Sequence, residues 1–198
     1  MRDSHDPPWK TLPTKHIIVS LGANTTGCWG GPYDTLCRSL NELERCGINI
    51  VCCSSVYRTN PHVAAGMMPA FYNAVVLVRS HYAIGSLLRV LKNIERRAGR
   101  RLSARWSRRP LDLDIVDFGG RVLNWPSLTR RLGPIVLPHP LVQERGFVLV
   151  PLAEIAPKWR HPVLGLSAEG LLKANPRLRR GVVLTNQLQD QFRSAQGR

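Results

Sequence analysis

Hydrophobic residues recur with two different periods along this chain, and the two periods predict a mixture of strands and helices. Short apolar runs, some with alternating polar positions, predict strands at residues 16–20, 48–57, 71–79 and 111–117. Apolar residues spaced three or four apart predict one helix that ends before Gly47 and another over residues 84–98. Asp34 is the expected N-cap of the first helix, because its carboxylate can accept a free backbone N–H there.

The predicted order is strand, helix, strand, strand, helix, strand, which is typical of a ferredoxin-like split βαβ unit. We therefore predict an α+β fold, with an antiparallel sheet in a ferredoxin-like core and flanking helices. A turn at Gly119–Gly120 predicts a short hairpin partner at 121–123, and a last helix is expected near 167–173. The predicted single domain covers residues 16–175, between a disordered leader at 1–15 and a C-terminal extension with a flexible tail at 176–198.

The strongly positive net charge indicates that the protein binds an anionic partner. The formal charge is +15, and only five of the 28 basic residues are lysines. Arginine is the planar, bidentate partner of phosphate, so the balance fits nucleic acid, a membrane surface or an anionic small substrate equally well. No apolar run approaches the roughly 18 residues that a membrane span needs. The five cysteines form no CxxC pair, which favours reduced thiols and a cytoplasmic location.

Two carboxylates follow each other on one face of the strand at 111–117. Leu111, Leu113 and Ile115 are expected to point into the core, which leaves Asp112 and Asp114 facing solvent roughly 6.5–7 Å apart. Such close like charges repel, so we expect a positive group between them. A hard divalent cation, Mg²⁺ above all, suits paired carboxylates. The alternative is an ordinary strand with two solvated aspartates.

Seven arginines and no acid lie between Arg96 and Arg109, directly before these carboxylates. Arginines beside carboxylate-bound Mg²⁺ are suited to a polyphosphate, because phosphoryl transfer depends mainly on positioning and charge neutralisation. The chain contains no Gly-Lys dipeptide and hence no P-loop. A nucleotide would therefore be bound by arginine side chains and metal. The alternative is a solvated basic loop.

Two further positions are candidates for a site. Alternation along 71–79 places Phe71 and Asn73 on one face, where they could stack on a flat heterocycle and hydrogen-bond its edge, or serve as ordinary core residues. His139 lies between two prolines, which suits either a site residue or a capping and packing role.

Taken together, the motifs resemble the 6-hydroxymethyl-7,8-dihydropterin pyrophosphokinase (HPPK) family of folate biosynthesis. The resemblance covers roughly residues 16–166, in order and with sensible gaps. The matching segments are Leu21-Gly22-Ala23-Asn24, Val56-Tyr57-Arg58-Thr59, Phe71-Tyr72-Asn73-Ala74-Val75, Ile94-Glu95-Arg96, Gly99-Arg100, Arg105-Trp106, Arg109-Pro110-Leu111-Asp112-Leu113-Asp114, Pro138-His139-Pro140, and Arg145-Gly146-Phe147 through Pro151-Leu152.

The resemblance implies ATP-dependent transfer of a pyrophosphoryl group to the pterin hydroxymethyl, which gives the pterin diphosphate and AMP (EC 2.7.6.3). It implies small-molecule substrates, ATP and hydroxymethyl-dihydropterin, with no nucleic acid, no membrane and no obligate protein partner. It also makes 16–175 a pyrophosphokinase domain, in which loops at about 22–31, 58–69 and 99–107 close over the substrates.

The family's residue roles fall on matching positions. By resemblance, Asp112 and Asp114 bind two Mg²⁺ ions, and Arg100 and Arg109 stabilise the phosphates. Residues implied in pterin binding are Thr59, Phe71, Asn73 and Phe147, with the two phenylalanines sandwiching the ring. Residues implied around ATP are Glu95, Arg105, Trp106, His139 and Arg145.

The chain departs from the family pattern within the arginine loop. Ser107-Arg108 replaces the usual Gly-Pro, and Leu102 stands where a second loop arginine is often found, beside Arg101. These changes leave open whether Arg101 or Arg108 supplies the missing phosphate contacts.

Two other functions remain alternatives. One is a different Mg²⁺-dependent nucleotide transferase, which the release of AMP would distinguish. The other is a basic nucleic-acid-binding module, since ferredoxin-like sheets can present aromatic residues to single strands. That module should interleave aromatics with its basic residues, but the arginine loop contains only Trp106.

Overall fold

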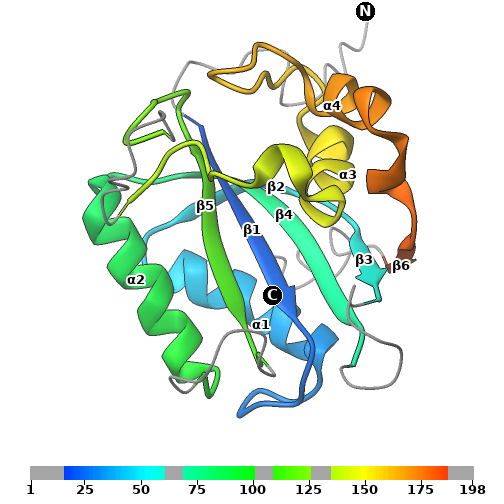
Figure 1. Ribbon diagram of the computed structural model, residues 1–198. Helices are drawn as coiled ribbons and strands as arrows, with labels where there is room; N and C mark the ends of the chain where they lie inside the picture. Colours follow the sequence, from blue (N-terminus) through cyan, green and yellow to red (C-terminus); the bar gives the residue numbers. More distant parts are fainter. Residues whose placement is uncertain (1–15, 61–68, 101–108, 126–134, 187–198) are drawn as a thin grey trace, which may run out of the picture.

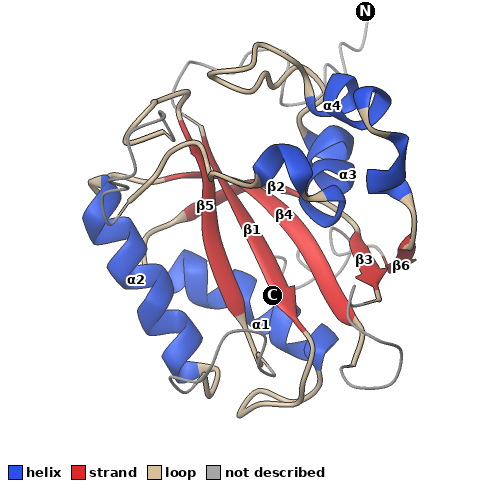
Figure 2. Ribbon diagram, in the orientation of Figure 1, coloured by secondary structure: helices blue, strands red, loops and turns tan. Residues whose placement is uncertain are grey.

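The computed structural model describes residues 16–60, 69–100, 109–125 and 135–186. In these residues six strands form one antiparallel sheet with helices on both faces, as Figures 1 and 2 show. The α+β fold and the antiparallel sheet are therefore confirmed. The predicted leader at 1–15 and the tail at 187–198 lie outside the described residues.

The sheet places β1 between the two strands that carry the candidate site residues. The strand order is β5 (Asp112–Phe118), β1 (Ile17–Ala23), β4 (Phe71–Arg79), β3 (Val56–Thr59) and β6 (Val182–Asn186), and β2 (Asn49–Cys53) also pairs with β4. Every pairing is antiparallel. β1, the first strand in the sequence, is thus an interior strand of the sheet, as expected for the ferredoxin-like order.

The single strand predicted at 48–57 is wrong, because two serines divide it into β2 and β3. The Ser54 hydroxyl donates to the Ser55 carbonyl at 2.7 Å and accepts the Val75 N–H at 2.9 Å. The Ser55 N–H and hydroxyl both donate to Glu154, from 2.8 to 3.1 Å. Side-chain hydrogen bonds thus replace part of the backbone ladder and bend the chain.

The helices divide between the two faces of the sheet, because successive strand residues point to opposite sides. One hydrophobic core lies under α1 (Pro32–Arg45) and α2 (Ile84–Arg97). The other lies under α3 (Gly146–Ile155) and α4 (Ala168–Ala174). Two short 3-10 helices, η2 (Val142–Glu144) and η3 (Pro176–Arg179), connect the second layer. The predicted second and last helices are confirmed.

Two local predictions are wrong. Asp34 is the third residue of α1 and not its N-cap; Gly31 is the N-cap, and its N–H donates to the Asp34 carboxylate at 3.3 Å. The strand expected at 121–123 is reduced to an isolated bridge, because Leu123 exchanges its two backbone hydrogen bonds with Leu137. Leu137 is followed by a cis peptide bond to Pro138.

The C-terminal part of the chain joins the sheet, although its sequence predicted no strand. β6 pairs with β3, so the sheet extends into the predicted C-terminal extension. A β-carbon on Gly146 would lie 1.7 Å from the Leu178 carbonyl oxygen, so only glycine lets η3 pack against the start of α3. No helix in the described ranges is long and apolar enough to span a membrane.

Candidate active site

Strand register brings residues from three strands into one row across the sheet. Gly22 of β1 pairs with Asp112 of β5 on one side and with Asn73 of β4 on the other. These three positions lie on the face that α3 and α4 cover farther along the sheet. Val75 lies two residues after Asn73 and Val116 four residues after Asp112, so they point to the same face, and both belong to the core under α3 and α4. The candidate carboxylates and the candidate ring-binding amide therefore stand two strands apart on one surface.

Four basic side chains surround the two carboxylates. Asp112 pairs with Arg100 and Arg109, and Lys92 lies 4.0 Å from it. Asp114 lies 3.5 Å from Lys92 and 3.6 Å from Arg145. The positive charge expected on this face is thus present in the protein itself.

Asp112 and Asp114 are both half-buried on the expected face of β5. The Asp112 side chain is 20% exposed, against 30% for Asp114. Burial alone would raise the pKa of Asp112, but the guanidinium groups of Arg100 and Arg109 outweigh it, and the pKa is lowered. Asp112 is therefore an ionised carboxylate held by arginines rather than one half of a repelling pair.

Helix α2 supports this cluster from the free edge of β5. Buried Glu95 accepts the Leu113 N–H at 2.7 Å and pairs with Arg100 at 2.7 Å. Lys92 donates to the Leu113 carbonyl at 3.0 Å and to Glu95 at 2.7 Å. Unpaired edge groups of the strand are satisfied in this way. Sequence reasoning missed Lys92, although its spacing of three residues from Glu95 was a usable signal.

The residues that flank the arginine loop are held by the loop after β1. Asn24 and Arg109 exchange two hydrogen bonds, from the Arg109 N–H to Asn24 Oδ1 at 2.7 Å and from the Asn24 N–H to the Arg109 carbonyl at 3.0 Å. The Cys28 N–H donates to the Ala98 carbonyl at 3.2 Å. Arg105 and Trp106 themselves lie outside the described residues.

The amide of Asn73 is oriented by β3. Its Nδ2 atom donates to Thr59 Oγ1 at 3.0 Å, and Tyr57 contributes a carbonyl at 3.5 Å. The Oδ1 atom is then directed toward Gly22, since a β-carbon at Gly22 would lie 3.4 Å from it. Asn73 thus directs a hydrogen-bond acceptor toward β1, on the face that carries the carboxylates.

Two aromatic candidates flank this row. Phe71 is half-buried and precedes Asn73 on the same face of β4. Phe147, at the start of α3, packs against the core on that face, and the Arg145 guanidinium lies 5.7 Å from its ring centroid. Arg145 therefore links the Asp114 carboxylate to the Phe147 ring.

His139 lies beside the same charges. The backbone N–H of His139 donates to the Val116 carbonyl at 2.8 Å, and its imidazole Nδ1 atom accepts the Leu141 N–H at 3.1 Å. Burial, followed by the Arg145 charge, lowers the pKa of His139 to about 4. A neutral imidazole therefore faces the site at neutral pH.

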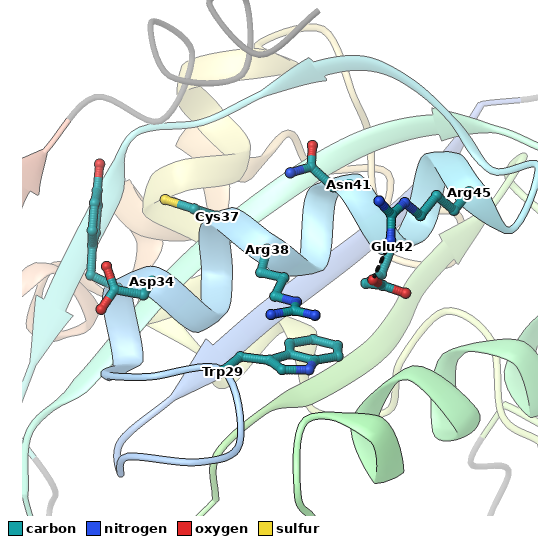
Figure 3. A pocket seen from close by; sticks show the side chains of 8 residues that line it. Trp29, Asp34, Cys37, Arg38, Asn41, Glu42 and Arg45 are labelled. Carbon is teal, nitrogen blue, oxygen red and sulfur yellow. Dashed lines mark hydrogen bonds and ion pairs between the residues drawn. The ribbon is translucent and has the colours of Figure 1, made fainter.

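A separate hollow of about 430 Å³ lies along α1, and α1 packs on the opposite face of the sheet. Figure 3 shows the Arg38 guanidinium over the Trp29 ring, at 5.2 Å from its centroid. Glu42 is buried there and pairs with Arg45 at 3.4 Å and with Arg97 of α2 at 2.7 Å. The buried Glu42 carboxylate thus links α1 to α2 beside this hollow.

Comparison with known proteins identifies the family. The profile of 7,8-dihydro-6-hydroxymethylpterin-pyrophosphokinase (HPPK) matches residues 18–157. The chain belongs to the HPPK family. It is 38% identical over 149 residues to the 2-amino-4-hydroxy-6-hydroxymethyldihydropteridine pyrophosphokinase of Synechocystis sp., with 75% of this chain and 70% of the relative covered. It is 34% identical over 149 residues to the Pseudomonas aeruginosa protein of the same name, with 75% and 85% covered.

Longer proteins contain a similar region. The Pneumocystis carinii folic acid synthesis protein fol1 is 34% identical over 157 residues, which are 79% of this chain and 20% of that protein. The solved Plasmodium falciparum HPPK-DHPS structure with SDX-DHP matches with a TM-score of 0.61 at 16% identity, over 83% of this chain and 45% of that one. The chain thus spans less than half of such proteins, and the structural likeness shows the fold alone.

Most of the site residues implied by the HPPK resemblance lie close together in the described structure. Direct contacts, shared register or, for His139, electrostatic interaction connect the following set: Thr59, Asn73, Glu95, Arg100, Arg109, Asp112, Asp114, His139, Arg145 and Phe147. Phe71 lies on the same face of β4 by alternation.

The donor set fits a magnesium site completed by substrate. The described residues contain no group of three or more His, Cys, Asp or Glu side chains that could hold a metal. Mg²⁺ is commonly bound by one or two carboxylates together with phosphate oxygens and water. Asp112 and Asp114 supply such carboxylate oxygens, and the surrounding arginines and lysine supply partners for the phosphates.

Proposed function

We propose that the protein transfers the pyrophosphoryl group of ATP to the hydroxymethyl group of 6-hydroxymethyl-7,8-dihydropterin, a step of folate biosynthesis. The observation that supports this proposal best is the row Asp112, Gly22, Asn73, in which a carboxylate paired with arginines and an amide held by Thr59 share one face of the sheet. Membership of the HPPK family supports the reaction class.

In this reaction the substrate hydroxyl oxygen forms a bond to the β-phosphorus of ATP. The bond between that phosphorus and the oxygen bridging to the α-phosphate breaks, and its electron pair leaves on AMP. The hydroxyl proton passes to solvent. Two Mg²⁺ ions held by Asp112 and Asp114 would offset the phosphate charge and lower the pKa of the attacking hydroxyl.

The chain's own basic residues stabilise the transferred group. Arg100 and Arg109 reach Asp112 from two sides, so small rotations would bring both guanidinium groups to a phosphate beside it. Arginine offers bidentate, charge-assisted hydrogen bonds to phosphate. We propose that Glu95, Arg105, Trp106, His139 and Arg145 line the nucleotide subsite.

The pterin is proposed to bind against β4. The Asn73 Oδ1 atom is an acceptor for ring N–H groups, and Thr59 holds it in that orientation. Phe71 and Phe147 would stack on the ring and exclude water from the transferred group.

One assay tests the reaction directly. Purified protein is incubated with ATP, Mg²⁺ and 6-hydroxymethyl-7,8-dihydropterin, and the products are separated by chromatography. We expect AMP and the pterin diphosphate in equal amounts. Release of ADP and a pterin monophosphate would replace the proposal with a simple kinase, and no turnover in the presence of both substrates would refute it. A control without pterin excludes ATP hydrolysis.

A further inference from the structure

Only two residues of β1 reach the surface of the sheet. Ser20 and Gly22 are half-buried, whereas the other five residues of the strand are buried. Both point to the face that carries the site, since they alternate with the buried Leu21. The register places Ser20 beside Asp114 and Gly22 beside Asp112. These two positions therefore form the exposed surface of β1 between the carboxylates of β5 and the residues of β4.

Ser20 and Gly22 each lie in a row of three paired residues across β5, β1 and β4, and the two rows differ in the residue that β4 contributes. Ser20 pairs with Val75, which belongs to the core under α3. Gly22 pairs with Asn73, whose acceptor oxygen is directed toward it. Of these two rows, only the one through Gly22 joins a carboxylate to a side chain that can hydrogen-bond the edge of a heterocyclic ring.

The backbone does not require glycine at position 22. Gly22 is absent from the residues with positive φ. A β-carbon there would lie 3.4 Å from Asn73 Oδ1 and 4.0 Å from the Asp112 β-carbon, so alanine fits between these residues with little adjustment. A side chain would cover the half-buried backbone of β1 between Asp112 and Asn73.

We propose that Gly22 is a specificity-determining residue, whose missing side chain leaves the space through which the hydroxymethyl arm of the pterin reaches the phosphate at Asp112. This inference rests on the function proposed above. Neighbouring strands lie about 4.8 Å apart, so a ring read at Asn73 and a phosphate held at Asp112 are separated by roughly 10 Å. The methylene carbon of the arm and its attacking hydroxyl oxygen must lie between them, above β1.

The experiment compares Gly22→Ala with wild type in calorimetric titrations, at saturating Mg²⁺ and a non-hydrolysable ATP analogue. Two ligands are used, 6-hydroxymethyl-7,8-dihydropterin and 7,8-dihydropterin, which lacks the arm. We expect the variant to bind the first about tenfold more weakly, the usual scale of one forced methyl clash, and the second as tightly as wild type. Affinity for the nucleotide analogue should be unchanged.

Gly85→Ala is the matched control. Gly85 lies in α2, and a β-carbon there meets no atom within 4 Å. This variant should bind both pterins and turn over like wild type, and the melting temperatures of both variants should stay close to that of wild type.

Three results would overturn the inference. Equal weakening of both pterins would show that the added methyl disturbs the ring or Asn73 instead of the arm. Unchanged binding of both would show that the space is not used. If the wild type bound neither pterin and released no AMP, the proposed function would fall first, and this inference with it.

A measurement on the wild type needs no variant. In the ternary complex, nuclear Overhauser contacts between the Gly22 α-protons and the methylene protons of the arm are expected. Contacts from Gly22 to ring protons alone, or to no pterin proton, would contradict the placement even if Gly22→Ala failed to fold.

Discussion

Arg100 shares its guanidinium Nη1 atom between Asp112 and the buried carboxylate of Glu95. The carboxylate that we assign to Mg²⁺ is thus occupied by an arginine that we assign to phosphate. If Asp112 held the metal of a metal–nucleotide complex, Arg100 would be free to bind phosphate, and both groups would keep an oppositely charged partner. Preorganised charges of this kind need little rearrangement during transfer.

Asp112→Asn should destabilise the metal-free protein, because it leaves Arg100 and Arg109 without their shared partner. We expect a loss on the order of 1 kcal/mol, or a melting temperature roughly 2–4 °C lower for a domain of this size. Asp114→Asn is the matched variant and should lose less, because its nearest charges are 3.5 and 3.6 Å away. Both should lower turnover by about 100-fold or more. A more stable Asp112→Asn protein would indicate that repulsion between Asp112 and Asp114 outweighs the pairing of Asp112 with the arginines.

Arg109→Ala should lower kcat far more than it weakens binding of the ATP analogue, if its guanidinium acts on charge that develops during transfer. Arg89→Ala removes the same charge from an exposed site on α2, where Arg89 hydrogen-bonds Ser86. Steady-state kinetics and nucleotide titrations of both variants separate the two effects. Similar losses in both proteins would indicate a general electrostatic field.

Phe147→Ala and Phe71→Ala should each weaken pterin binding by about tenfold or more, because each removes one stacking face and its buried area. Binding of the ATP analogue in binary complex serves as the internal control and should hardly change. Calorimetric titration with each ligand provides the comparison. A Phe147→Ala protein with wild-type pterin affinity would exclude the sandwich.

Thr59→Ala should weaken pterin binding about three- to tenfold, since the loss of one hydrogen bond frees the Asn73 amide to rotate. Thr59→Ser keeps the hydroxyl and should restore the affinity, whereas Thr59→Val should not. The three variants are compared by titration with pterin in the presence of the nucleotide analogue. If valine were tolerated as well as serine, the hydroxyl would have no role in orienting Asn73.

Stability should fall with acidification through the titration of His139. Its pKa is lowered to about 4, mainly by burial and then by Arg145, whereas an unfolded histidine titrates near about 6.5. Between these values the unfolded chain binds more protons, so this contribution to folding is full above about pH 6.5 and lost as the pH falls toward 4.

Thermal unfolding of wild type and His139→Gln across this range checks the effect. The difference in unfolding free energy between the two proteins should change as the pH falls from 6.5 to 4, and it should stay constant above pH 6.5. His81→Gln, on the exposed segment before α2, is the control and should run parallel to wild type. A pH-independent difference for His139→Gln would contradict the lowered pKa.

Local patterns predicted much of this protein because the burial of a helix or strand repeats with its own period. The α2 stripe, the alternation of Leu111, Leu113 and Ile115, and the order of strands and helices along the chain all followed from residues close together in sequence. The carboxylate pair was visible for the same reason. The departure at Asp34 concerns the end of a helix, and the one at residues 121–123 concerns a very short element; in both cases few residues specify the structure.

Only the tertiary structure determined which distant residues meet. Asp112, Gly22 and Asn73 form a row because of strand register, which no local pattern specifies. The division of β2 from β3 depends on Glu154, which lies 99 residues after the Ser55 whose N–H and hydroxyl it accepts. Hydrogen bonds and ion pairs of this kind act through space, so their partners can be recognised only once the sheet and its helices have brought them together.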